Sequence, residues 1–287
     1  MIWHTFFQPF IEFGFMRRAL VVCIALSLST TALGVFLLLR RMSLMGAALS
    51  HAILPGVAGG YLLSGMSLLA MTVGGVIAGI VVALVAGWVS RRTPLKEDAS
   101  FAGFYLGSLA LGVTLVSLRG SNVDLLHLLF GSILAVDSDS ALFVAGVASL
   151  TLACIALFYR GLVTEAFDSA WLQVNARRLP ALLHGLFLAL LVLNLVAGFQ
   201  VLGTLMAVGV MMLPAVSARC WARTLPAILL LAALSGTFCA WMGLSLSWAV
   251  NLPAGPAIVL TASGIFCISV FFGTHSRLTV GWRKLMG

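Results

Sequence analysis

One ionisable side chain, His51, lies inside a long apolar stretch. It follows Arg41 by ten residues, which is about 15 Å at helical rise and places the imidazole near the middle of a bilayer. Polar groups at that depth are costly and by default functional. Pro55, four residues later, has no N–H to bond the carbonyl oxygen of His51. The pattern predicts that His51 and the neighbouring Ser50 face a polar pathway; a histidine hydrogen-bonded to a neighbouring helix at a proline kink is the alternative.

A second pair, Asp124 and His127, is spaced about one helical turn apart between two apolar stretches. The surrounding residues 124–131 have apolar positions at helical spacing but are too few to cross a bilayer, which predicts a half-helix or re-entrant segment. Carboxylate and imidazole there could form an outer vestibule for cations. An exposed pair that only solvates a loop is the simpler alternative.

The carboxylates argue against a transporter driven by an ion gradient. All eight lie at the ends of apolar stretches or between them, whereas ion-coupled transporters usually need an ionisable group at membrane depth. This chain does not bind ATP either, because its only lysines, Lys96 and Lys284, do not occur in a phosphate-binding loop of the form Gly-x-x-x-x-Gly-Lys-Ser/Thr. We therefore expect the energy to come from ATP on a partner subunit.

A docking surface for such an ATPase is predicted between Arg160 and Arg178, the longest connection on the basic side. Residues 165–175 can form a short amphipathic helix that lies under the membrane. We expect a coupling segment at about 161–178.

An intramembrane serine protease is a competitor from a different class, because Ser50 and His51 are both buried in an apolar stretch. Neighbours on a helix point about 100° apart, so these two side chains cannot form a catalytic dyad with each other. The chain is predicted not to be an enzyme.

The elements that position these residues are membrane spans. The 287 residues are 62% hydrophobic and 8% charged, with a mean hydropathy of +1.15, far from the quarter of charged residues in soluble domains. The sequence predicts an all-α, polytopic transmembrane helix bundle in a single domain, 1–287. About nine spans are expected: 17–39, 43–64, 67–90, 100–118, 140–159, 180–198, 201–218, 224–243 and 255–273.

The basic residues predict the orientation of these spans. The net charge of +8 comes from short clusters between spans, which is typical of topology signals and not of nucleic-acid binding. Alternation of the spans places 13 of the 16 basic residues on one side and only Arg17, Arg18 and Arg119 on the other. The amino terminus is therefore expected outside and the carboxyl terminus in the cytoplasm of a bacterium, with the chain in its inner membrane.

Small and polar residues in the spans predict how the helices pack. Glycine pairs at four-residue spacing, which allow close helix contact, are Gly56/Gly60, Gly75/Gly79 and Gly103/Gly107. Asn194 and Gln200 are expected to hydrogen-bond between helices. Residues 54–57 (LPGV) are echoed at 213–216 (LPAV), which suggests a weak inverted repeat in which Pro55 and Pro214 are gating kinks. His184 lies near a span end, and no role is predicted for it.

Several strings together resemble the permease subunits of the manganese/zinc/iron ABC importer family. The most specific is residues 40–56, RRMSLMGAALSHAILPG, and the resemblance extends over nearly the whole chain. The other strings are 96–100 (KEDAS), 129–136 (LFGSILAV), 205–215 (LMAVGVMMLPA) and the pairs Phe167-Asp168 and Val174-Asn175.

The resemblance implies a type II ABC importer permease that forms a homodimer. It implies that the chain accepts a metal ion from a periplasmic metal-binding protein and docks an ABC ATPase on its coupling segment. By the same resemblance, His51 faces the translocation path. The residues implied in ATPase coupling are Glu165, Phe167, Asp168, Val174 and Asn175.

One departure from the family concerns the metal. Members commonly have an acidic residue one turn before this histidine, and here that position is Ala47. Losing a carboxylate should weaken manganese more than zinc, since imidazole suits zinc. We therefore predict a divalent transition metal, zinc first and manganese or iron next, with no covalently bound cofactor. A related siderophore or corrinoid permease, with a wider path, is the alternative transporter.

Overall fold

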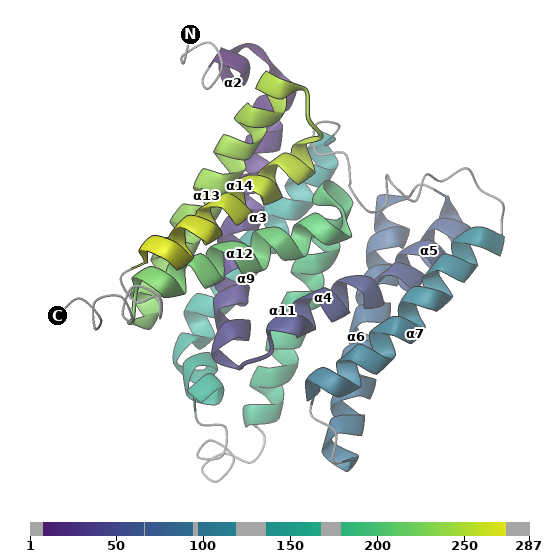
Figure 1. The fold of residues 1–287 in the computed structure, drawn as a ribbon. Coiled ribbons are helices and arrows are strands. Elements are labelled where there is room, and N and C mark those ends of the chain that lie inside the picture. The colour runs from purple at the N-terminus through teal and green to yellow at the C-terminus, as the bar shows by residue number, and fades with distance from the viewer. Residues whose placement is uncertain (1–7, 66, 94–96, 119–135, 168–178, 274–287) are drawn as a thin grey trace.

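The computed structural model describes residues 8–65, 67–93, 97–118, 136–167 and 179–273. Throughout these residues the regular elements are helices (Figure 1), so the predicted all-α fold is confirmed. The helices are α2 (Gln8–Glu12), α3 (Gly14–Leu39), α4 (Ser43–Ala52), α5 (Leu54–Ser64), α6 (Leu68–Arg92), α7 (Glu97–Leu118), α9 (Ser138–Phe167), α11 (Leu179–Leu202), α12 (Thr204–Trp221), α13 (Leu225–Val250) and α14 (Ala254–Phe272).

The predicted spans correspond to these helices. Seven described segments are long and apolar enough to cross a membrane, one of them the combined α4 and α5, and two shorter apolar segments lie within α7 and α12. The boundaries differ most at the carboxyl ends of two helices. Helix α9 continues to Phe167, where 159 was predicted, and α13 continues to Val250, where 243 was predicted. Both extensions carry the helix beyond the length that a bilayer core requires.

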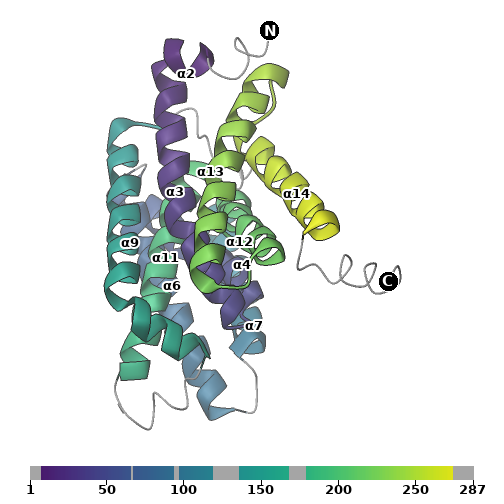
Figure 2. The ribbon, with the colours of Figure 1, turned by 90° about the vertical axis from the view of Figure 1, so that its left-hand side faces the viewer.

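Helix α4 joins two groups of helices. Figure 1 shows α5, α6 and α7 together on one side, and α3, α9, α11 and α13 together on the other, with α4 running between them. In the turned view of Figure 2, α3 and α9 run side by side while α14 is inclined across the outside. A residue near the end of α4 is therefore placed where the two groups meet.

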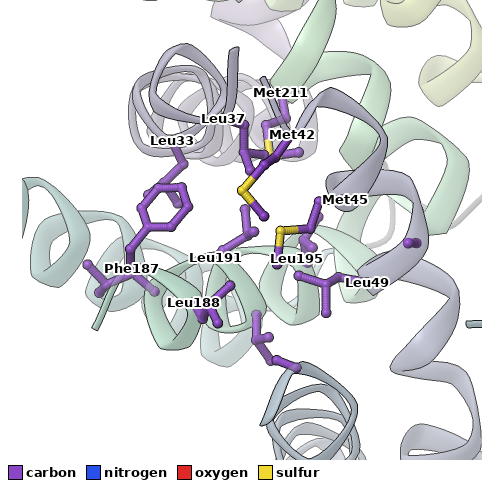
Figure 3. Close-up of a cluster of buried hydrophobic side chains, with 14 of the residues drawn as sticks. Leu33, Leu37, Met42, Met45, Leu49, Phe187, Leu188, Leu191, Leu195 and Met211 are labelled. Atoms are coloured by element: carbon purple, nitrogen blue, oxygen red, sulfur yellow. The ribbon is translucent and has the colours of Figure 1, made fainter. Parts of the chain in front are cut away.

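The largest buried cluster fixes α4 in this position. Figure 3 shows side chains of this cluster converging from different helices around α4. The members that Figure 3 labels are Leu33 and Leu37 of α3, Met42 of the turn, Met45 and Leu49 of α4, Phe187, Leu188, Leu191 and Leu195 of α11, and Met211 of α12. Met45 and Leu49 are almost fully buried. One face of α4 is thus embedded between α11 and α12.

Helices α5 and α6 approach each other closely, as the glycine pairs predict. A Cβ atom on Gly56 would collide with the carbonyl oxygen of Gly74, and one on Gly60 would collide with that of Ala70. Only glycine allows backbones this close. The prediction for Gly103 and Gly107 is wrong within this chain, because a Cβ at either position would meet nothing within 4 Å.

Two predicted interhelical hydrogen bonds are confirmed. Asn194 of α11 donates to the hydroxyl of Thr151 of α9 at 2.6 Å. Gln200, further along α11, donates to the hydroxyl of Thr72 of α6. Helix α11 is therefore joined by polar contacts to both groups of helices.

Candidate functional site

The span predicted at 43–64 is broken at Ile53, where α4 ends and α5 begins. Pro55 lies in the first turn of α5, where its missing N–H and fixed φ are tolerated. The amides of Gly56 and Val57 both donate to the carbonyl of Ile53 at 3.1 Å, which starts the new helix. Pro55 has no N–H, so it cannot donate the usual helical hydrogen bond to the carbonyl oxygen of His51.

The break is held by tight packing against α6 and α7. Ile53 is 1% exposed, and it faces Gly75 and Gly79 of α6, where added Cβ atoms would lie 3.0 and 3.2 Å from its side chain. A Cβ on Gly112 of α7 would lie 3.0 Å from the nitrogen of Pro55. Small residues on α6 and α7 therefore leave just enough room for the broken backbone.

His51 lies in the last turn of α4, directly before the break. Its ring is half-buried and faces Tyr105 of α7, with the ring centroids 5.9 Å apart. Its Nδ1 atom is buried and has no hydrogen-bond partner among the described residues, and the same holds for the hydroxyl of the adjacent Ser50. A neutral imidazole nitrogen without a protein partner is a suitable ligand for a transition metal.

His51 does not belong to a cluster of metal ligands in the described part of the chain. Ala47, half-buried one turn earlier on α4, contributes no donor. Among the residues that the structure describes, no group of three or more His, Cys, Asp or Glu side chains could hold a metal ion. The arrangement therefore suits brief contact with a passing ion better than a resident metal.

The predicted coupling segment is only partly described. Glu165 and Phe167 form the last turn of α9, where the sequence predicted the start of a separate short helix. The side chain of Phe167 is 68% exposed. Glu165 instead points into the protein and pairs with Arg40. Asp168, Val174 and Asn175 lie outside the described residues.

The remaining predicted site residues stay predictions. Asp124 and His127 also lie outside the described residues. Pro214 lies within α12, which is assigned as one helix from Thr204 to Trp221. Its missing N–H leaves the carbonyl oxygen of Val210 without the usual helical donor.

Two residues that contact the end of α9, Arg40 and His184, were missed by the sequence reasoning. Arg40 was counted only as a topology signal and His184 was given no role, yet both contact the carboxylate of Glu165. A signal was available, because a carboxylate flanked by apolar residues at a span end usually has a basic partner. The partner itself could not be named from sequence, since 125 residues separate Arg40 from Glu165.

Comparisons with known proteins agree with this geometry. The family model of the ABC 3 transport family matches residues 12–273. The manganese transport system membrane protein MntC of Halalkalibacterium halodurans is 35% identical, over 97% of this chain and 94% of the relative. The manganese import system permease protein ScaB of Streptococcus gordonii is 33% identical, over 95% and 96%.

Solved structures show the same fold. PsaBC from Streptococcus pneumoniae, determined in complex with a Fab, has a TM-score of 0.86 at 32% identity and covers both chains fully. A protein assigned to the metal-chelate type of ABC transporter, in an inward-facing conformation, has a TM-score of 0.66 at 18% identity, over 92% of this chain and 88% of that one. The second likeness shows a common fold only.

The family match covers most of the chain, and the two named relatives are similar to this chain over nearly their full lengths. The relatives are membrane components of ABC transporters and not enzymes, which removes the intramembrane protease as a competitor. The chain therefore belongs to the ABC 3 transport family and is one of its membrane permease subunits.

Proposed function

We propose that this chain is a single permease domain of an ATP-driven importer, and that a divalent transition metal passes the imidazole of His51. The position of His51 is the observation that carries the proposal. Its Nδ1, which has no hydrogen-bond partner among the residues that the structure describes, lies beside a helix break, where α4 meets α7. Relatives named for manganese transport support a metal as the cargo.

Manganese and zinc are both candidates for that metal, and different observations favour each. The names of the relatives favour manganese. The donor chemistry favours zinc, because Ala47 supplies no carboxylate and imidazole suits zinc better than manganese. The order that puts zinc first remains a prediction, and uptake of the two ions by the same preparation decides it.

The proposed partners follow from the rest of the chain. An ABC ATPase would hydrolyse ATP and contact the end of α9 through the exposed Phe167 and through Asp168, Val174 and Asn175. A periplasmic metal-binding protein would deliver the ion on the opposite side, toward Asp124 and His127. A second copy of the chain is the third proposed partner, since the resemblance implies a homodimer.

Metal uptake by the reconstituted complex tests the proposal. The permease and its ATPase are placed in vesicles, and ATP-dependent entry of ⁵⁴Mn²⁺ and ⁶⁵Zn²⁺ is measured for the native chain and for His51→Ala. We expect the variant to lose most of the uptake, because it removes the strong metal donor that His51 places at the break. Ser43→Ala, an exposed position at the start of the same helix, should transport normally. Undiminished uptake of both ions by His51→Ala would remove the imidazole from the pathway.

The siderophore-type alternative is tested in the same vesicles. A ferric or cobalt chelate is offered in place of the free ion. Entry of the chelate, without entry of either free metal, would replace the proposal with that alternative.

A further inference from the structure

A buried ionic cluster joins the ends of three helices. Arg40, the C-cap of α3, donates from Nη2 to Oε2 of Glu165 in α9 at 2.7 Å. The Nδ1 atom of His184 in α11 lies 3.4 Å from the other carboxylate oxygen and 3.2 Å from Nη1 of Arg40. The guanidinium carbon of Arg40 lies 4.0 Å from the ring centroid of Phe187, one turn further along α11.

Burial makes this cluster different from an ordinary surface ion pair. The side chains of Arg40 and Glu165 are each only 7% exposed, so water screens their attraction weakly. Removing one partner would leave an uncompensated charge in a poorly hydrated place, which is strongly unfavourable. The cation–π contact between Arg40 and Phe187 makes it still more unfavourable to move Arg40 out of the cluster. The ends of α3, α9 and α11 are therefore expected to move together.

The turn from α3 to α4 is short and specifically bonded. The amide of Met42 donates to the carbonyl of Leu37 at 3.0 Å and that of Arg41 to the carbonyl of Leu38 at 3.2 Å, which is the Schellman pattern at a helix end. Arg41 has a φ of 58°, in the left-handed region where glycine is usual. Met42 and Leu37 belong to the same buried cluster (Figure 3). Because this turn is short and hydrogen-bonded, α4 is expected to move together with Arg40.

The other end of the connection leads to the proposed ATPase contact. Glu165 precedes the exposed Phe167 by two residues in the last turn of α9. Glu165 therefore lies between a surface that would contact the ATPase and the helix that carries His51.

We propose that Glu165 is a positioning residue for coupling, which transmits the movement of the ATPase through Arg40 to α4 and so to His51. His184 and Phe187 hold Arg40 in place for this task. The inference rests on the proposed function, because it assumes an ATPase at the end of α9. It goes further by naming the residues within one chain that connect the proposed ATPase contact at the end of α9 to His51 in α4.

The first test measures transport per ATP hydrolysed. Glu165→Gln keeps the shape of the side chain and removes its charge, and Asp139→Asn, at the exposed opposite end of α9, is the matched control. We expect Glu165→Gln to hydrolyse ATP but to lower metal uptake per ATP about tenfold, a usual size for coupling between distant sites. The control should keep the native ratio. A native ratio in Glu165→Gln would overturn the proposal.

A second variant keeps the test decisive if a single unpaired charge prevents folding. Arg40→Met combined with Glu165→Leu removes both charges and fills their volume, a replacement that buried pairs commonly tolerate. A folded double variant that still assembles with the ATPase and has lost coupling supports the proposal. Normal coupling in this variant means that the cluster only stabilises the fold, and contradicts it.

A third measurement uses no metal, so it can be read even if the cargo is misidentified. Spin labels are placed by cysteine substitution at the exposed Leu44 of α4 and Leu234 of α13, with the native cysteines replaced. ATP binding to the assembled complex should change the distance between the labels in the native chain and in Asp139→Asn, but not in Glu165→Gln. The same ATP-dependent change in Glu165→Gln would disprove the connection, whichever ion is carried.

Discussion

The imidazole of His51 offers a passing ion one strong donor. Ser50 can add a hydroxyl from the same turn, but the described residues supply no carboxylate or thiolate cluster around it. Weak binding suits a conduit, because an ion that binds tightly at mid-membrane leaves slowly. Selectivity would then depend on the partner that captures the ion, and only secondarily on this permease.

Ala47 is the residue where a single substitution should change the preferred ion. Ala47→Asp places a carboxylate one helical turn before His51, on the same face of α4. Carboxylate oxygen suits manganese, so the KM for ⁵⁴Mn²⁺ uptake should fall about tenfold, which corresponds to about 1.4 kcal/mol. The KM for ⁶⁵Zn²⁺ should change less, because the imidazole of His51 is already a suitable ligand for zinc.

The control for this prediction is Ala47→Asn, which has nearly the same shape without the negative charge. It should leave the KM for manganese close to the native value. If the aspartate variant folds and its KM is native for both ions, then Ala47 does not face the path that the ion takes.

His51 could be identified from the sequence because its depth follows from counting residues after Arg41. The cluster around Glu165 could not, because its members come from three helices and lie far apart in the chain. The separation is 125 residues between Arg40 and Glu165 and 144 between Arg40 and His184. Apolar periodicity predicts that a helix is buried but does not say which helix is beside it.

At the scale of elements, the break between α4 and α5 depends on the helices that surround it. Pro55 predicted a local disturbance, but a proline in a span can also give only a kink. The broken backbone fits in its place because the facing residues on other helices are glycines, Gly75 and Gly79 of α6 and Gly112 of α7. Pro55 alone predicted that the helix would be disturbed. The room for a full break comes from residues on other helices, which the local sequence does not reveal.

The close contact between α5 and α6 makes Gly56 intolerant of any side chain. In Gly56→Ala the new methyl group would collide with the backbone of Gly74, which cannot yield as a flexible side chain could. We expect a loss of stability of about 1–3 kcal/mol, measured as a lower Tm of the purified protein in detergent.

Gly59, on the same helix, provides the comparison. A Cβ there would meet nothing within 4 Å, and alanine favours helix over glycine by about 1 kcal/mol. Gly59→Ala should therefore match or exceed the native Tm. Equal Tm values for the two variants would show that α5 and α6 are not in close contact.

At the scale of the whole molecule, the helices alternate in direction, so their ends are divided between the two faces of the membrane. The carboxyl ends of α3, α6 and α9 all lie at the lower side of Figure 1. Arg40 and Arg92 lie at the first two of these ends, and Arg160 lies about two turns before the third. An excess of arginine on one side is the usual mark of the cytoplasmic face. The proposed ATPase contact at Phe167 requires this same orientation.

Helix α9 allows the orientation to be tested with one element, because its 30 residues extend about 45 Å and reach both surfaces. Asp139→Cys and Thr164→Cys are exposed positions near its two ends, and each is introduced after the native cysteines are replaced by serine. An impermeant maleimide added to intact spheroplasts should label Cys at position 139 and not at 164, and permeabilised cells should label both. The reverse pattern would place the amino terminus in the cytoplasm, and Phe167 could then not contact a cytoplasmic ATPase.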